Sequence, residues 1–277
     1  MDIQAIVLDI DGTLLTSDRK ITKKTKEALL TAQEAGIKLL LASGRSTFGL
    51  VPFAKELNMQ KYGGLLIANN GAMVTDASGN KMHLNETIHQ TPVKTLIQHI
   101  QYFDAHVMLM DHKKLHTMNV EQAVIETEKG PLNVVIAESE DCGLEIVEHA
   151  HLNDFNEPVT KITIAAKPTK LSEMSKELMA PIEQEVSHAF TSPHFIEIMK
   201  KGVDKAYGLD DALETLGISN KQAIAFCDGE NDLPLIQHAG IGVAMGNATE
   251  NVKKHADLIT HTNDNDGIAE VLKTHIL

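Results

Sequence analysis

Two acidic segments of the chain could hold a metal ion, and each lies at the end of a short apolar run. Asp9 and Asp11 lie two positions apart at the end of the first run, so their side chains leave it on the same side. Asp228 and Asp232 form the second segment. Carboxylates that converge on one crevice repel one another and take up protons unless a cation lies among them. Because all these donors are oxygens, they favour a hard ion, and Mg²⁺ suits them better than zinc.

Two further segments could bind an anion beside that metal. Ser43 and Gly44 offer a hydroxyl and free backbone amides at the start of a predicted helix, where a phosphate is readily held. Lys205 supplies a fixed positive charge, whereas we expect Arg45 to be structural or a contact at the rim. A carboxylate, a hydroxyl, a lysine and Mg²⁺ around one anion are the parts that a phosphoryl-transfer site requires.

Apolar runs and helical patterns alternate over both ends of the chain. Continuous apolar runs, as expected for strands buried on both faces, occur at residues 5–10, 37–42, 65–68, 223–226, 241–245 and 256–260. Helices are predicted between them at residues 22–35, 46–57, 204–216 and 231–238. These segments predict an α/β fold with a Rossmann-like, doubly wound parallel sheet. Such sheets bind ligands at the carboxyl ends of their strands, which is where the polar segments lie.

The middle of the chain has a different pattern and contains none of these motifs. Strand-like runs occur there at residues 107–110, 134–136 and 161–166. We interpret residues 84–188 as an inserted α+β cap domain, and residues 1–83 and 189–277 as the core. The cap is expected to cover the site, control access to it and exclude water.

Composition and charge restrict the partners and the compartment. The 277 residues include 25 Lys and Arg against 38 Asp and Glu, a net charge of −13 that argues against nucleic acid or an anionic membrane as a partner. Cys142 and Cys227 are the two cysteines, too few for a disulfide framework or a four-cysteine metal site. No basic segment precedes a long apolar stretch. We therefore expect a cytoplasmic protein.

The fourteen histidines suggest a zinc site as an alternative to the acidic one. His112 and His116 are four residues apart, and His149 lies two residues before His151. A helical zinc motif would also need a glutamate directly after the first of two such histidines, and this chain has none there. We expect these histidines to be solvated residues of the cap.

Taken together, the polar motifs resemble those of the haloacid dehalogenase superfamily of phosphohydrolases, in the order found in that family. The motifs are Asp9-x-Asp11-Gly-Thr13, Ser43-Gly-Arg45, Lys205 and Asp228-x-x-Asn231-Asp232. Further likeness to the Cof-type branch with a type IIB cap lies in Asn70-Gly71-Ala72, Ile196-Glu197-Ile198 and Ala244-Met245-Gly246-Asn247-Ala248. The resemblance covers essentially the whole chain and is weakest through the cap.

The resemblance implies a role for each of the acidic residues. Asp9 would be the nucleophile that forms an aspartyl-phosphate, and Asp11 the acid and base that protonates the leaving oxygen and then activates water. Asp9, the backbone carbonyl of Asp11, and Asp228 would hold Mg²⁺. Asp232 would orient the metal shell or Lys205.

The same resemblance implies the phosphate-binding residues and a reaction class. Ser43, Gly44, Lys205 and Asn231 would surround the transferring phosphoryl group. The expected activity is Mg²⁺-dependent hydrolysis of small phosphorylated metabolites, such as sugar phosphates, nucleotides, FMN or pyridoxal phosphate. The alternatives are a phosphomutase, which returns the phosphoryl group to a sugar, and a phospho-acceptor signalling module, which needs neither a second aspartate like Asp11 nor a cap.

Two positions depart from the family pattern. Cys227 stands where the family usually has glycine, and Asp204 stands where serine or threonine commonly precedes the lysine. Neither change removes a required group, but Asp204 adds a negative charge near the site.

Overall fold

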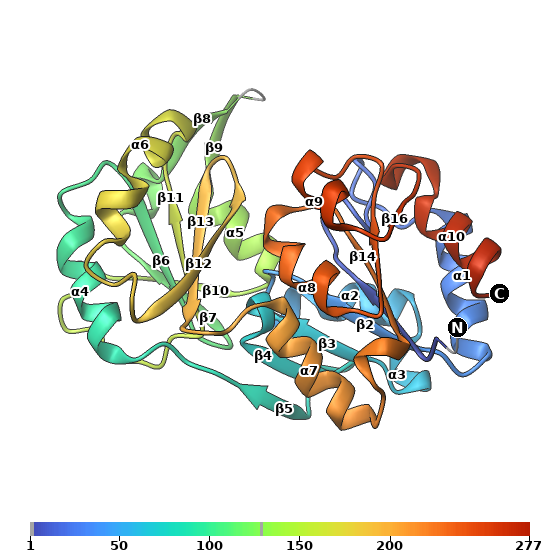
Figure 1. Ribbon diagram of the computed structural model, residues 1–277. Coiled ribbons are helices and arrows are strands. Elements are labelled where there is room, and N and C mark those ends of the chain that lie inside the picture. The colour runs from blue at the N-terminus through green and yellow to red at the C-terminus, as the bar shows by residue number, and fades with distance from the viewer. Residues whose placement is uncertain (1–2, 128–129) are drawn as a thin grey trace.

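The protein consists of two lobes, each built around its own sheet (Figure 1). The computed structural model describes residues 3–127 and 130–277. One lobe contains an eight-stranded sheet of order β16-β15-β14-β1-β2-β3-β4-β5. Its strands are β1 (Ala5–Leu8), β2 (Lys38–Ala42), β3 (Leu65–Ala68), β4 (Met73–Asp76), β5 (Met82–Asn85), β14 (Ala223–Cys227), β15 (Ile241–Ala244) and β16 (Leu258–Ile259).

This core sheet is parallel from β16 to β3, and β4 and β5 add an antiparallel hairpin at one edge. Around it lie the helices α1 (Lys23–Glu34), α2 (Thr47–Glu56), α3 (Met59–Tyr62), α7 (Lys205–Leu216), α8 (Leu233–His238), α9 (Glu250–His255) and α10 (Gly267–His275). Side chains of α1, α2 and α10 pack in one apolar cluster with alternate residues of β1 and β2. Side chains of α7, α8 and α9 pack with the intervening residues in another cluster. The sheet is therefore covered on both faces, which confirms the doubly wound core.

The second lobe is the inserted cap. Its six-stranded sheet has the order β10-β7-β6-β11-β13-β12. The strands are β6 (His106–Met110), β7 (Lys114–Thr117), β10 (Glu145–Glu148), β11 (Lys161–Ala165), β12 (Val186–Ser192) and β13 (Phe195–Lys200). The helices are α4 (Gln90–Ile100), α5 (Val134–Cys142) and α6 (Pro168–Met179), and a separate hairpin joins β8 (Val124–Thr127) to β9 (Gly130–Asn133).

The expected domain limits at residues 84 and 188 differ from the sheets that the structure shows. Residue 84 falls within β5, which pairs with β4 of the core sheet. Residue 188 falls within β12, and β12 and β13 pair with each other and, through β13, with β11 of the cap sheet. The chain thus stays in the cap sheet through Lys200. The residue at which the chain returns from the cap to the core is set by pairing between strands that are distant in the sequence. No local sequence pattern indicates such pairing.

The strand expected at residues 134–136 is wrong, because these residues form the first turn of α5. Asn133 caps this helix: its side-chain oxygen accepts hydrogen bonds from the backbone amides of Val135 and Ile136 at 3.1 and 3.0 Å. A cap of this kind satisfies amides that a helix start leaves unpaired, and it outweighs the strand preference of three β-branched residues. None of the helices within the described ranges has the length and apolar character that a bilayer crossing requires.

Candidate active site

The first acidic segment leaves the core sheet at the end of β1 and turns sharply. Gly12 makes the turn with φ of +84°, a conformation that favours glycine. A Cβ at this position would lie 2.2 Å from Oδ2 of Asp228, so the backbone also approaches that carboxylate closely. The Thr13 hydroxyl donates to Oδ1 of Asp228 at 2.6 Å. The turn after β1 therefore fixes the orientation of a carboxylate that follows β14.

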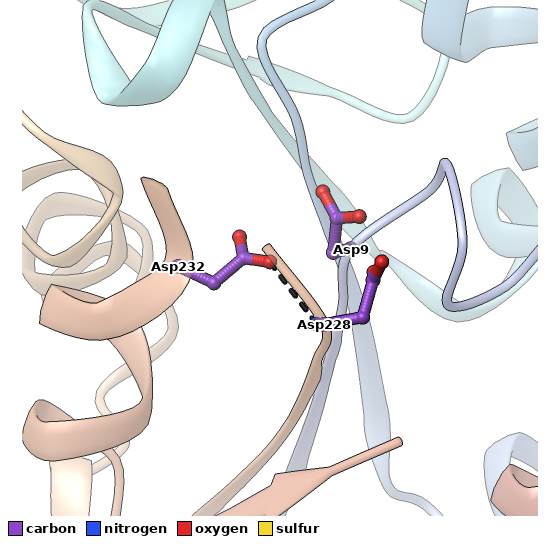
Figure 2. Close-up of side chains that lie close together, drawn as sticks. All are labelled: Asp9, Asp228 and Asp232. Atoms are coloured by element: carbon purple, nitrogen blue, oxygen red, sulfur yellow. Dashed lines mark hydrogen bonds between the residues drawn. The ribbon is translucent and has the colours of Figure 1, made fainter. Parts of the chain in front are cut away.

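Three carboxylates converge beside this turn, from Asp9, Asp228 and Asp232 (Figure 2). One oxygen from each lies within 4.8 Å of the others. Burial, together with the charge of Asp232, raises the pKa of Asp9 well above its ordinary value, although Lys205 opposes the shift. Burial likewise raises the pKa of Asp228 to about 6, against the effect of the Thr13 hydrogen bond. A buried oxygen-donor set that resists ionisation in this way fits a hard divalent cation.

Asp232 differs from the other two because its oxygens already have protein partners. Its Oδ2 accepts from the backbone amides of Asp228 and Gly229 at 3.3 and 3.0 Å, and its Oδ1 accepts from Nζ of Lys205. The Lys205 ammonium, only 1% exposed, also donates to Oδ1 of Asp9 at 2.6 Å. Asp232 thus holds Lys205 against Asp9 and shapes the backbone at Asp228. Two of the three ammonium protons of Lys205 are engaged in these contacts.

The departures at positions 204 and 227 have simple structural explanations. Asp204 caps α7 by accepting from the backbone amide of Tyr207 at 2.9 Å. Its negative charge therefore interacts favourably with the positive end of the helix dipole. Cys227 is fully buried at the end of β14, where its thiol packs in the apolar cluster below the site.

Ser43 and Gly44 begin the loop between β2 and α2. Ser46, rather than Ser43, caps that helix by accepting from the backbone amide of Phe48. The Ser43 oxygen accepts from the backbone amide of Arg45 at 3.2 Å, which leaves its hydroxyl proton available to an anion. The Ser43 side chain is therefore not used to cap α2.

Arg45 contributes more directly to the site than a rim residue would. It is buried, and its Nε and Nη2 donate to the two carboxylate oxygens of Asp11 at 2.8 and 2.7 Å. Its Nη1 donates to the backbone carbonyl of Asp141, in α5 of the cap, at 3.1 Å. Asp11 itself is exposed. The bidentate pair fixes Asp11 in a plane and links its position to the cap.

All the predicted site residues except Lys205 border one cavity of about 290 Å³ between core and cap. Lys205 lies beneath it, in contact with Asp9. Sequence reasoning gave no site role to the cap residues that line the same cavity, although Glu197 stands in the motif Ile196-Glu197-Ile198. These residues are Glu138, Asp141, Cys142, Lys161, Thr191, Ser192, Phe195 and Glu197. A signal for two of them was present, because Lys161 and Glu197 are charged residues within apolar strands. The residues of α5 carried no such signal.

Of the paired histidines, the structure brings together one from each pair. Nδ1 of His116 lies 3.0 Å from Nε2 of His149, and Nε2 of His116 lies 3.4 Å from Oδ2 of Asp111. This cluster is in the cap, and none of its members borders the 290 Å³ cavity. His116 is buried rather than solvated, contrary to expectation.

Comparisons with known proteins agree with this arrangement. The family model described as haloacid dehalogenase-like hydrolase matches residues 6–272. The 5-amino-6-(5-phospho-D-ribitylamino)uracil phosphatase YcsE of Bacillus subtilis (strain 168) is 29% identical over 280 residues, which cover 100% of this chain and 97% of that protein.

Two solved structures match over both lobes. A haloacid dehalogenase-like hydrolase from Bacteroides thetaiotaomicron is 36% identical, with a TM-score of 0.84. A sugar phosphatase of haloacid dehalogenase subclass IIB is 27% identical, with a TM-score of 0.81. Each match covers 98% of both chains. The chain therefore belongs to the haloacid dehalogenase superfamily, as a Cof-type, subclass IIB phosphoric monoester hydrolase.

Proposed function

We propose that the protein is a Mg²⁺-dependent phosphatase that hydrolyses small phosphorylated metabolites through an aspartyl-phosphate on Asp9. The observation that carries this proposal is the buried Asp9 carboxylate, held by Lys205 next to the cavity that Asp11 and Asp228 also border. In the first step an Asp9 oxygen forms a bond to phosphorus while the bond from phosphorus to the leaving oxygen breaks. Asp11 gives that oxygen a proton.

The second step hydrolyses the aspartyl-phosphate and regenerates the free Asp9 carboxylate. Asp11, now ionised, takes a proton from water, whose oxygen attacks the phosphorus and displaces Asp9 as a carboxylate. Ser43, the Gly44 backbone and the remaining proton of Lys205 bind the phosphoryl oxygens, and Asn231 lies beside them. The pairing with Arg45 keeps the Asp11 carboxylate oriented between these steps.

Asp9, the backbone carbonyl of Asp11, and Asp228 would hold the metal, and Asp232 would position Lys205 and the Asp228 loop. Mg²⁺ bound there offsets the negative charge of the carboxylates and of the phosphoryl oxygens. The donor set fits this ion because it consists of oxygens and because burial disfavours the ionised carboxylates in its absence.

The substrate is proposed from cavity size and from the relatives. A volume of about 290 Å³ suits a sugar or polyol phosphate better than a dinucleotide-sized ligand. One relative is named for a ribitylamino-uracil phosphate and another for sugar phosphates. The signalling-module alternative assumed a chain without a cap, whereas this chain has one. We place the enzyme in the cytoplasm, where the two free, buried cysteines would stay reduced.

A hydrolysis screen tests the proposal. Sugar phosphates, nucleotides, FMN and pyridoxal phosphate would be incubated with the protein and Mg²⁺, and phosphate release measured against Asp9→Asn prepared in the same way. We expect release from at least one sugar or polyol phosphate that disappears in the variant and after chelation with EDTA. Equal release by both proteins, or activity that survives exhaustive chelation, would contradict the mechanism.

A further inference from the structure

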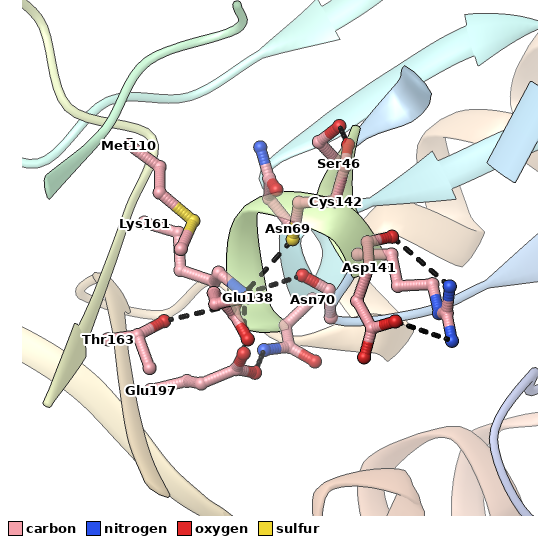
Figure 3. A network of polar contacts seen from close by, with 12 residues as sticks. Ser46, Asn69, Asn70, Met110, Glu138, Asp141, Cys142, Lys161, Thr163 and Glu197 are labelled. Carbon is pink, nitrogen blue, oxygen red and sulfur yellow. Dashed lines mark hydrogen bonds and ion pairs between the residues drawn. The ribbon is translucent and has the colours of Figure 1, made fainter. Parts of the chain in front are cut away.

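A charged lysine is completely buried where the cap meets the core. Lys161, the first residue of β11, has no exposed surface. Its Nζ donates to the backbone carbonyl of Gly44 in the core at 2.7 Å, and within the cap to Glu138 at 3.0 Å and to Glu197 (Figure 3). Lysine is rarely buried to this extent unless it is paired. These three contacts account for all three protons of the ammonium group.

The register of the cap sheet places Lys161 and Glu197 on one face. Thr163 of β11 lies directly opposite Glu197 of β13. Residues opposite each other in an antiparallel pair point to the same side, as do residues two positions apart in a strand. Lys161 and Glu197 therefore both leave the cap sheet toward the core loop that contains Gly44.

Glu197 reaches the core by two contacts of its own. Its Oε2 would lie 2.6 Å from a Cβ built on Gly44, so the absence of a side chain at position 44 lets the carboxylate approach the loop. The side-chain amide of Asn70 donates to the same oxygen. Asn70 in turn accepts from the side-chain amide of Asn231 at 3.3 Å. The network thus runs from the Ser43-Gly44 loop through the cap to Asn231.

The charges in this network are mutually dependent. Burial acts to lower the pKa of Lys161, but Glu138 and Glu197 outweigh that effect and the pKa is raised. The lysine is thus held as a cation, and its donors are already taken by protein atoms. Removing one member of such a buried pair leaves an uncompensated charge. Lys161 is accordingly suited to position other groups rather than to bind substrate.

We propose that Lys161 and Glu197 are a docking pair: they seat the cap on the Ser43-Gly44 loop and hold that loop and Asn231 at the spacing that binds a phosphoryl group. This inference rests on the proposed phosphate-binding role of those two segments. It assigns positioning, not catalysis, to Lys161 and Glu197. The cap then contributes to binding of the phosphoryl group that all substrates share, in addition to covering the leaving group.

Seating of the cap can be measured without substrate. The chain has no tryptophan, and Phe48 of α2 is 42% exposed beside Gly143, which follows α5 of the cap. Phe48→Trp therefore provides a single tryptophan at the contact between the lobes, and it can be excited selectively over the three tyrosines. In this background, Lys161→Met should shift the emission to the red and raise its quenching by acrylamide. Lys170→Met, which removes an exposed cap lysine paired with Asp104, is the matched control and should change neither.

Kinetics separate docking from recognition of the leaving group. Misplacing a phosphate-binding loop by about 1 Å can reduce the rate by about 10²-fold. We expect Lys161→Met to lower kcat/KM by about that factor for a sugar phosphate and equally for p-nitrophenyl phosphate. The inhibition constant of inorganic phosphate should rise as well, and Lys161→Arg should recover part of the loss. Far-ultraviolet circular dichroism would confirm that each variant is folded.

A double-mutant cycle between Gly44 and Glu197 gives a second test, which does not require a change at Lys161. Gly44→Ala places a Cβ against the Glu197 carboxylate and should lower kcat/KM, as should Glu197→Ala. If the two side chains compete for the same space, the double variant should be no worse than the worse single variant. Losses that multiply would contradict the close approach on which the proposal depends.

Other results of the kinetic and fluorescence experiments also test the docking pair. A loss confined to the sugar phosphate, with an unchanged phosphate inhibition constant, would make Lys161 a reader of the leaving group and overturn the docking pair. Unchanged kinetics in folded Lys161→Met, together with unchanged acrylamide quenching of the introduced tryptophan, would overturn it too. Absence of phosphatase activity in the parent protein would instead contradict the proposed function, and the fluorescence measurement would still test seating of the cap.

Discussion

The core sheet and the cap sheet present their charged residues in different ways. In the core, β1 and β14 are apolar and buried along their length, and the charged groups of the site come directly after them, as Asp9 follows β1 and Asp228 follows β14. In the cap, charged residues lie within the strands, as Lys161 begins β11 and Glu197 is the third residue of β13. The core therefore places its charged site residues at an edge of its sheet, whereas the cap places them on a face of its sheet.

This difference follows from how each sheet is covered. The core sheet has helices on both faces, so its edge at the carboxyl ends of the strands is the place left for a ligand. The cap sheet has one face that meets the core, and a side chain on this face can reach the site from the middle of a strand. Charged residues there are buried where the lobes meet, as Lys161 reaches the backbone of Gly44 and Glu197 accepts from Asn70.

The largest expected effect on turnover comes from changing Asp9, the carboxylate that follows a core strand. Asp9→Asn keeps the shape of the side chain but removes the anionic nucleophile, so turnover should fall by about 10⁴-fold or more. Lys205 retains its contact with Asp232, so the fold should survive. Phosphate release and circular dichroism check the two expectations. A folded variant with a sizeable fraction of parent activity would exclude the covalent mechanism.

The next largest effect on turnover should distinguish the role of Asp11 from that of Asp228. Asp11→Asn keeps an acceptor for Arg45 but cannot exchange a proton, so turnover on a sugar phosphate should drop by about 10² to 10⁴-fold. The loss should be smaller for formation of aspartyl-phosphate from p-nitrophenyl phosphate, whose leaving group needs less protonation. Asp228→Asn keeps an acceptor for Thr13 and should instead harm both substrates alike.

Mg²⁺ titration of the two variants provides the control. Asp228→Asn should need at least about tenfold more Mg²⁺ for half-maximal activity, whereas Asp11→Asn should need the parent concentration, because the metal would use the backbone carbonyl of residue 11. Equal damage to both leaving groups in Asp11→Asn, together with a raised Mg²⁺ requirement, would show that the Asp11 side chain serves the metal.

Much of the core could be predicted because its signals are local. Each apolar run that the sequence indicates corresponds to a core strand, and β3 coincides with its predicted range of 65–68. The helix predicted at residues 22–35 is α1, and Thr22 caps it by accepting from the backbone amide of Thr25. Polar residues that follow such runs are brought together by the parallel topology itself. Their convergence on one cavity therefore needed no knowledge of distant contacts.

The cap could not be predicted in the same way because its structure depends on distant pairing. Whether residues 189–200 continue the cap sheet is decided by pairing with β11, which lies well before them in the chain. The β-branched start of α5 indicates a strand locally, although Asn133 caps a helix there. That error concealed Glu138 and Asp141, two cavity residues that α5 supplies. Sequence reasoning failed where core and cap meet.

A smaller and selective effect is expected from a cap residue that lines the cavity without joining the docking pair. Phe195 begins β13 and borders the cavity. Phe195→Ala removes apolar contact with the leaving group and should raise KM for a sugar phosphate about tenfold. It should leave the inhibition constant of inorganic phosphate unchanged, because no leaving group is present. A parallel change in both constants would show that Phe195 also supports the phosphate loop.

The smallest effect concerns the carboxylates of the core in the absence of substrate, and it should depend on pH. The pKa of Asp228 is raised to about 6, so this carboxyl binds more protons in the folded metal-free protein than in the unfolded chain between roughly pH 4 and 6. Stability from Asp228 is therefore fully present at low pH and is lost as pH rises through about 6, and the raised pKa of Asp9 adds a loss of the same sign. Mg²⁺ binds the ionised carboxylates and must displace protons below that pH.

Added Mg²⁺ should consequently raise the melting temperature by a few degrees at pH 7.5 and by much less at pH 5, as scanning calorimetry can measure. Asp228→Asn should lose most of the increase at pH 7.5, since it removes both the repulsion and a ligand. Asp154→Asn, an exposed cap carboxyl, should keep it in full. An equal increase at both pH values, or one that survives Asp228→Asn, would place the responsible Mg²⁺ site outside the core cluster and away from the edge of its sheet.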